Sequence, residues 1–210
     1  MRVVYLHGFA SGPLSTKAQF FHLKLGQNGV KCDIPQLDEG HFEALSVSGQ
    51  LRVIDSAVGG EKVTLMGSSL GGYLAALYAA RHPNVEKLVL LAPAFQFPTR
   101  WRKRFSPDEL SQWKADGTRN FFHYGYKTER PLGYRFVEDA VQYEDEPDFR
   151  QPALVVHGLH DDVVPVEASE TFARNHPNVE LRVIESGHEL TDSLDRLWYE
   201  TAMFLGFQKR

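Results

Sequence analysis

Short apolar runs alternate with helical patterns along most of the chain, and this alternation restricts the fold more than any other feature. Four of the six runs lack alternation of apolar and polar residues, as do strands that helices cover on both faces. The last run does alternate and indicates an edge strand with one wetter face. The pattern predicts an α/β fold around a roughly six-stranded, mostly parallel sheet with helices on both faces. The expected strands are residues 3–6, 30–34, 63–66, 88–91, 154–157 and 179–184.

Four helices are expected between or after these strands. The first follows Ser15 as N-cap, and the second covers residues 47–58, where apolar side chains recur every three or four positions. Residues 70–80 are apolar nearly all round, which predicts a buried helix. A terminal helix has one apolar face over residues 194–205, with Thr191 as its N-cap.

One segment interrupts the alternation. Residues 93–151 place 59 positions between two strands, far more than a crossover helix and its loops require. The segment is enriched in aromatic residues, so we expect it to pack over something apolar, either the main domain or a bound ligand. The chain is therefore expected to be a single domain over residues 1–210 with an insertion at about residues 95–150.

Composition and charge exclude several classes of protein. Hydrophobic residues make up 42% and charged residues 24%, which is ordinary for a globular protein and argues against disorder. A formal net charge of -4 provides no basic field for nucleic acid, and no apolar stretch approaches the roughly 20 residues of a membrane span. The single cysteine, Cys32, excludes an intrachain disulfide framework, and the first apolar run is too short for a secretory signal. A cytoplasmic location is expected.

Gly67-Ser68-Ser69-Leu70-Gly71 fits the pattern G-x-S-x-G and lies between an expected strand and the buried helix. A sharp strand-to-helix turn presents the central serine at its tip, and the glycines let neighbouring chain approach closely. Ser69 is therefore the candidate nucleophile. The alternative is an ordinary loop rich in serine and glycine; a phosphate-binding loop fits worse, because it requires G-x-x-x-x-G-K-[ST].

A serine hydroxyl needs a histidine base and an acid that orients this base. His188 follows the last expected strand and Asp161 follows the strand before it, which places both at the carboxyl edge of the sheet. The chain order Ser69, Asp161, His188 matches that of α/β-hydrolases. A surface-loop histidine is the alternative for His188, and the adjacent Asp162 is the alternative acid, since either aspartate could instead cap the helix near Pro165.

The loop His7-Gly8-Phe9-Ala10 follows the first strand, from which a second oxyanion donor is expected. The N–H groups of Phe9 and Leu70 are the candidate oxyanion hole. The alternative is a glycine-rich turn in which His7 satisfies backbone groups.

Two further clusters of side chains could bind a ligand. The first, a metal site, lacks an H-E-x-x-H motif or a cysteine pair, so neither a metal nor a cofactor is expected. The second, a basic cluster, could receive an anionic substrate such as a phosphate-bearing thioester, but a solvated helix face explains it better. The first cluster is His157, His160, Asp161 and Asp162, and the second is Arg100, Arg102, Lys103 and Arg104.

Together these residues resemble the α/β-hydrolase superfamily over nearly the whole chain. The N-terminal segment is similar to that of the small bacterial YqiA-like esterases of the UPF0227 type, and the strand-to-helix turn at Ser69 also fits them. The N-terminal residues that carry the resemblance are Tyr5-Leu6-His7-Gly8-Phe9, followed by Ser11, Pro13, Ser15 and Lys17-Ala18. In two respects the chain departs from these patterns: its first strand corresponds to the third strand of the superfamily, and its acid loop, Gly158-x-x-Asp161-x-x-Val164-Pro165, resembles broader lipase and peptidase-like hydrolases. The resemblance favours Asp161 over Asp162 and implies an α/β-hydrolase fold with a helical cap.

The expected activity is that of a serine hydrolase, a carboxylesterase or thioesterase that acts on a small to medium acyl substrate through an acyl-enzyme. The cap aromatics would then line an apolar pocket for acyl or alcohol groups. A serine aminopeptidase, an amidase or a cofactor-free lyase is the alternative on the same fold, and a noncatalytic binding protein is the alternative from another class. A small-molecule ester or thioester is the expected partner, and a homodimer is left open.

Overall fold

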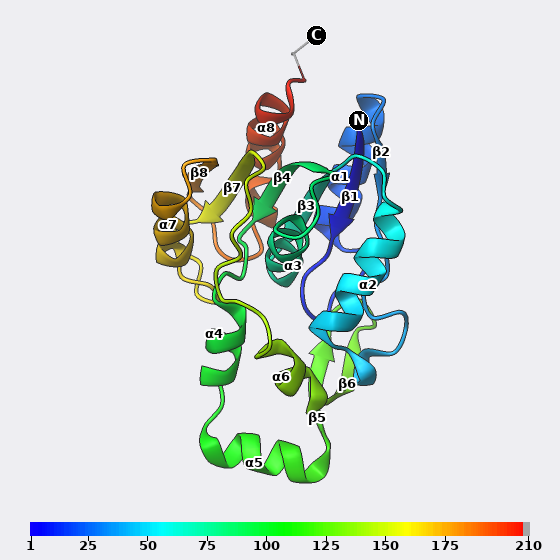
Figure 1. The fold of residues 1–210 in the computed structure, drawn as a ribbon, viewed down its shortest axis with the longest axis vertical. Helices are drawn as coiled ribbons and strands as arrows, with labels where there is room; N and C mark the ends of the chain where they lie inside the picture. The colour runs from blue at the N-terminus through cyan, green and yellow to red at the C-terminus, as the bar shows by residue number, and fades with distance from the viewer. Residues whose placement is uncertain (208–210) are drawn as a thin grey trace.

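The computed structural model describes residues 1–207. Its centre is a sheet of six parallel strands in the order β2-β1-β3-β4-β7-β8 (Figure 1). All six strands expected from the sequence are present, and β8 lies at an edge, as its alternating pattern predicts. The strands are β1 (Arg2–Leu6), β2 (Lys31–Asp33), β3 (Val63–Ser68), β4 (Val85–Leu91), β7 (Ala153–Gly158) and β8 (Val179–Ile184).

Helices cover both faces of this sheet, because successive strand residues point to opposite sides. Val4 and Leu88 belong to a buried cluster with α2, α3 and α7, whereas Val3 and Val89 pack with α1 and α8. Each fully buried aliphatic side chain stabilises the fold by about 1.5–3 kcal/mol. Functional side chains are therefore expected at the strand ends. The helices are α1 (Thr16–Gln27), α2 (Val47–Val58), α3 (Leu70–Ala79), α7 (Val166–Asn175) and α8 (Leu194–Leu205).

The helix positions agree with the sequence analysis, but one predicted cap is wrong. Thr191 begins a short 3-10 turn, Thr191–Ser193, and Ser193 takes the N-cap position of α8. Ser15 does precede α1, although its hydroxyl makes no capping bond within residues 1–207. Ser46, before α2, is a true side-chain cap, because its Oγ accepts a hydrogen bond from Gly49 N at 3.0 Å.

The insertion lies between β4 and β7 and holds three helices, as a helical cap requires, together with an antiparallel hairpin that the sequence analysis did not predict. Figure 1 shows these elements beyond the carboxyl ends of the strands. Pro131 sits within β6 and weakens the strand signal of this segment; a two-stranded sheet tolerates it, because one edge of each strand needs no partner. The elements are α4 (Phe97–Lys103), α5 (Pro107–Asp116), β5 (Thr118–His123), β6 (Thr128–Gly133) and α6 (Arg135–Ala140).

The insertion is anchored on the loop that follows β1. The ring of Phe9 lies 4.7 Å from that of Trp101, 5.6 Å from that of Phe121 and 5.8 Å from that of Phe136, measured between centroids. Tyr124 N also donates a hydrogen bond to Ala10 O at 2.7 Å. These contacts hold the insertion against the end of the sheet where the candidate residues lie.

Among residues 1–207, no helix is both long and apolar enough to cross a lipid bilayer.

Candidate active site

Ser69 occupies a strained turn between β3 and α3. Its φ of 53° and ψ of -119° lie in a region that non-glycine residues rarely adopt, and its N–H donates to Leu91 O at 2.9 Å. The turn is tight enough to exclude side chains on both sides. A Cβ on Gly71 would lie 2.1 Å from Leu6 O, and one on Gly67 would lie 2.3 Å from Gly71 O. The two glycines of the motif are therefore required by close backbone approach, and Ser69 is held at the tip.

His188 lies on the loop after β8, and its Nε2 is 3.0 Å from Ser69 Oγ. The loop is held by Lys17 of α1, whose Nζ donates to Glu189 O at 2.5 Å. Burial lowers the pKa of this lysine, while the charge of Glu189 acts in the opposite sense. The side chain of His188 is about nine-tenths buried, at 11% exposure, so the imidazole has a defined position.

The structure distinguishes between the two candidate acids. Asp161 Oδ2 lies 2.7 Å from His188 Nδ1, and its Oδ1 accepts hydrogen bonds from Val163 N at 2.9 Å and Val164 N at 2.7 Å. The Asp161 side chain is fully buried, whereas Asp162 is exposed. Asp161 is thus the aspartate that the fold brings to His188.

The hydrogen bonds among Ser69, His188 and Asp161 determine which of these side chains is charged and where the imidazole hydrogen lies. Burial raises the pKa of Asp161, but hydrogen bonds from His157, His188 and the backbone N–H of Val164 outweigh it and hold that pKa well below its usual range. An ionised carboxylate only accepts, so the hydrogen of the imidazole lies on Nδ1. The free Nε2 of His188 can then accept the proton of Ser69.

The candidate oxyanion donors flank Ser69. Leu70 is the first residue of α3, so its N–H has no acceptor within the helix, and the helix dipole favours negative charge at this end. The loop that carries Phe9 packs directly against the serine, since a Cβ on Gly8 would lie 3.4 Å from Ser69 Cβ. The fold thus brings the loop that carries Phe9 and the first residue of α3 beside Ser69.

His7 has the structural role that was considered as the alternative for this loop. It is buried, its Nε2 accepts a hydrogen bond from Leu37 N at 3.3 Å, and its Nδ1–H donates to Gly8 O at 3.0 Å. Burial lowers its pKa, which favours the neutral ring that these two bonds require. His7 therefore fixes the glycine beside Ser69.

The four residues of the candidate metal cluster do not share one site, since His157 and Asp161 are buried whereas His160 and Asp162 are exposed, and most of the basic cluster is exposed. His160 lies on the surface with its Nε2 2.8 Å from Glu185, and no group of three or more His, Cys, Asp or Glu within residues 1–207 is arranged to hold a metal ion. The basic residues end α4, where Arg104 lies over the ring of Trp101 at 5.2 Å.

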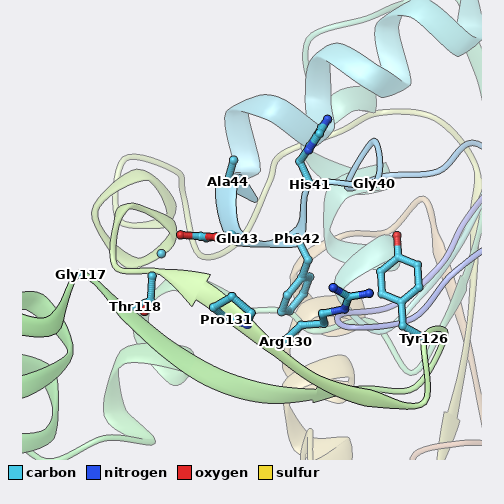
Figure 2. Close-up of a pocket in the computed structure, with 11 residues that line it drawn as sticks. Gly40, His41, Phe42, Glu43, Ala44, Gly117, Thr118, Tyr126, Arg130 and Pro131 are labelled. Carbon is cyan, nitrogen blue, oxygen red and sulfur yellow. The ribbon is translucent and has the colours of Figure 1, made fainter.

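Several aromatic side chains of the insertion pack into a buried core. Trp101, Trp113 and Phe136 are at most 5% exposed and pack on one another or on neighbouring rings, so they fill the insertion. A cavity of about 610 Å³ lies between residues 40–44 and the hairpin, with Arg130 and Tyr126 on its wall (Figure 2). Neither Ser69 nor His188 lines it.

Residues 2–204 match the family described as Uncharacterised protein family (UPF0227). The chain belongs to UPF0227. Among curated proteins, the AB hydrolase superfamily protein YisY of Bacillus subtilis (strain 168) is 29% identical over 162 residues, which cover 61% of this chain and 60% of YisY. The 2-hydroxymuconate semialdehyde hydrolase of Pseudomonas putida is 28% identical over 186 residues, covering 72% of this chain and 64% of that enzyme. The match thus spans less than two thirds of either relative.

Solved structures show the same architecture. Est1E from Butyrivibrio proteoclasticus, with ferulic acid bound, superposes with a TM-score of 0.84 at 23% identity, over 99% of this chain and 88% of Est1E. Alpha/beta hydrolase domain-containing protein 10 from mouse gives a TM-score of 0.81 at 18% identity, over 98% and 89% of the two chains. This UPF0227 chain therefore has the α/β-hydrolase fold, as its sequence predicts.

Proposed function

We propose that this UPF0227 protein is a serine hydrolase that cleaves carboxylic ester or thioester bonds through an acyl-enzyme. The observation that carries the proposal is the continuous chain from Ser69 Oγ to His188 Nε2 at 3.0 Å and from His188 Nδ1 to Asp161 Oδ2 at 2.7 Å. Ser69, the first of these three hydrogen-bonded residues, is held in a strained turn at a helix N-terminus, which is the placement that nucleophilic catalysis needs. The names of the two curated relatives, a member of the AB hydrolase superfamily and a hydrolase, support hydrolysis as the general type of reaction.

Acylation begins when Ser69 Oγ attacks the carbonyl carbon of the substrate while its proton passes to His188 Nε2. The carbonyl oxygen gains the electron pair of the broken π bond, and the N–H groups of Phe9 and Leu70 stabilise this oxyanion. Asp161 stays ionised and stabilises the imidazolium. When the tetrahedral intermediate collapses, His188 returns its proton to the departing alcohol or thiol.

Deacylation repeats these steps with water as the nucleophile. His188 takes a proton from water, the hydroxide adds to the acyl carbon, and collapse of the second intermediate returns the proton to Ser69 and releases the carboxylic acid. Side chains and backbone N–H groups supply every step, so the proposal requires neither a cofactor nor a metal. Because His188 must be neutral to act as a base, kcat/KM is expected to rise with pH to a plateau.

A series of p-nitrophenyl esters with acyl chains of about two to sixteen carbons tests this proposal and sizes the acyl site. Ser69→Ala is expected to lower kcat by at least about 10⁴. Ser68→Ala is the matched control, because it makes the same change at the buried neighbouring residue and leaves the nucleophile in place. Turnover that persists in Ser69→Ala, or no reaction of the wild type with any ester or with a fluorophosphonate, would contradict the proposal.

A further inference from the structure

A second histidine, His157, lies against Asp161. His157 is near the end of β7 and is fully buried. Its Nε2 is 3.0 Å from Asp161 Oδ2 and 2.9 Å from Val164 O, and its Nδ1 is 2.7 Å from Ser169 Oγ on α7. The ring therefore has polar partners on both nitrogens and connects α7 to the acid loop.

The hydrogen of this ring can be placed by elimination. Asp161 Oδ2 and Val164 O are both acceptors, so Nε2 must carry the hydrogen that the two oxygens share. Ser169 is also fully buried, and its hydroxyl then donates to the free Nδ1 of His157. Ser169 thereby selects the tautomer that directs an N–H toward the carboxylate.

The two oxygens of Asp161 differ in their surroundings. Oδ1 is held by two backbone N–H groups, those of Val163 and Val164, which fix the plane of the carboxylate without help from a side chain. Oδ2 faces two imidazoles, His188 at 2.7 Å and His157 at 3.0 Å. A change at His157 therefore acts on the same oxygen that receives the Nδ1–H of the proposed base.

We propose that His157 is a positioning residue of the active site, whose Nε2–H holds Asp161 Oδ2 and takes up part of its negative charge. The proposal rests on the function proposed above. A carboxylate oxygen that already receives one N–H attracts the proton of a second imidazole less strongly, because its charge is shared. His157 thus keeps His188 neutral, and able to act as a base, at a lower pH than a single imidazole on Asp161 would allow.

The other charged groups near Ser69, His188 and Asp161 have hydrogen-bond or ion-pair partners of their own. Lys17 of α1 donates to Glu189 O and lies 3.6 Å from the Glu189 carboxylate. His160 and Glu185 form an exposed pair. Asp192 accepts a hydrogen bond from the Ser186 hydroxyl, which lowers its pKa. The His157 variants retain all of these groups, so a difference between the variants is attributed to His157 itself.

The rate at which a fluorophosphonate inactivates the enzyme, measured from pH 5 to 9, reports the protonation of His188 without a known substrate. In His157→Leu the midpoint of the acidic limb is expected to move up by about 0.5–1 pH unit, because Oδ2 loses one donor. His157→Gln keeps an N–H at the position of Nε2 and is expected to restore the wild-type midpoint. A midpoint that stays or falls in His157→Leu, or the same rise in both variants, overturns the proposal.

Val155→Ala is the matched control for lost packing. Val155 is fully buried two residues earlier on β7, so its side chain leaves the sheet on the same face. It is expected to lower the melting temperature and to leave the midpoint unchanged. A purely structural role of His157 would make His157→Leu behave in the same way, with lower stability and no change in midpoint.

Nitrogen-15 NMR of the histidine rings in the wild type keeps one arm of the test independent of catalysis and of how well the variants fold. In the wild type, the hydrogen of His157 is expected on Nε2, and a hydrogen on Nδ1 at pH 8 would overturn the proposal. The same spectra follow the titration of His188 in the wild type and in His157→Leu. If the wild type fails to react with the fluorophosphonate, the proposed function fails, while the NMR titration still decides the role of His157.

Discussion

Gly71→Ala tests whether close backbone packing at the turn positions the nucleophile. Gly71 lies in the first turn of α3, and a Cβ there would lie 2.1 Å from Leu6 O and 2.6 Å from His7 O. Both obstacles are backbone carbonyls at the end of β1, next to the loop of the proposed oxyanion donor. The new methyl group can be accommodated only if α3 and this loop separate.

The size of the effect follows from these distances. Ordinary contacts require the carbonyls to withdraw by about 1 Å, and forcing extra atoms into a packed site costs about 3 kcal/mol when backbone must move. Alanine regains about 1 kcal/mol through its better helix propensity. The expected net loss in the free energy of unfolding is about 2 kcal/mol, which lowers the melting temperature by roughly 4–8 °C in a chain of this size. A displacement of about 1 Å between nucleophile and oxyanion donors lowers kcat by about 100-fold.

Gly26→Ala provides the matched control for this substitution. Gly26 lies in α1, and a Cβ there would meet nothing within 4 Å. This variant is expected to gain about 0.5–1 kcal/mol of stability with unchanged activity. Thermal unfolding and ester hydrolysis of both variants measure the two effects. A Gly71→Ala variant as stable and as active as Gly26→Ala would refute the packing argument.

Three further predictions concern the acid, acid stability and a helix cap. Asp161→Asn is expected to lower kcat by about 10⁴ and the exposed Asp162→Asn to change it little in the same ester assay, and a larger loss in Asp162→Asn would contradict the assignment. Burial lowers the pKa of His7, so the stability due to its neutral ring is present above about pH 6.5 and is lost as the pH falls toward the folded pKa. This loss is up to about 1.4 kcal/mol per pH unit; urea unfolding from pH 7 to 5 should show a steeper decline in the wild type than in His7→Gln, and equal slopes would refute it. Ser46→Ala should cost about 1 kcal/mol in urea unfolding, whereas Ser15→Ala, at a cap without a side-chain bond, should cost much less; equal losses would count against the capping geometry.

The main sheet and the meeting of Ser69, Asp161 and His188 could be predicted because both depend on local signals. Runs such as residues 63–66 are apolar on both faces, and this pattern specifies a covered parallel strand. Once the sheet is parallel, residues that follow different strands meet at one edge. Local signals do not separate Asp161 from Asp162, because adjacent residues share them; the family resemblance favours Asp161, and the structure brings that residue to His188.

The insertion was harder to predict, because its order comes from distant contacts. Pro131 obscured the β5–β6 hairpin, and the aromatic enrichment did not reveal that Phe9, from the other end of the chain, would join the same cluster. In the sequence, His157 is only one member of a candidate metal cluster. Its contact with Asp161 depends on the turn of the acid loop, which brings residue 161 back onto the ring.

The most direct test of the account is the intact mass of the protein after reaction with a fluorophosphonate, followed by peptide mapping. The wild type is expected to gain one adduct, carried by Ser69, because its hydroxyl lies 3.0 Å from His188 Nε2. Ser69→Ala is expected to gain none, and Ser68→Ala is expected to react as the wild type does. An unmodified wild type, or an adduct on a residue other than Ser69, would contradict the claim that Ser69 is the activated nucleophile.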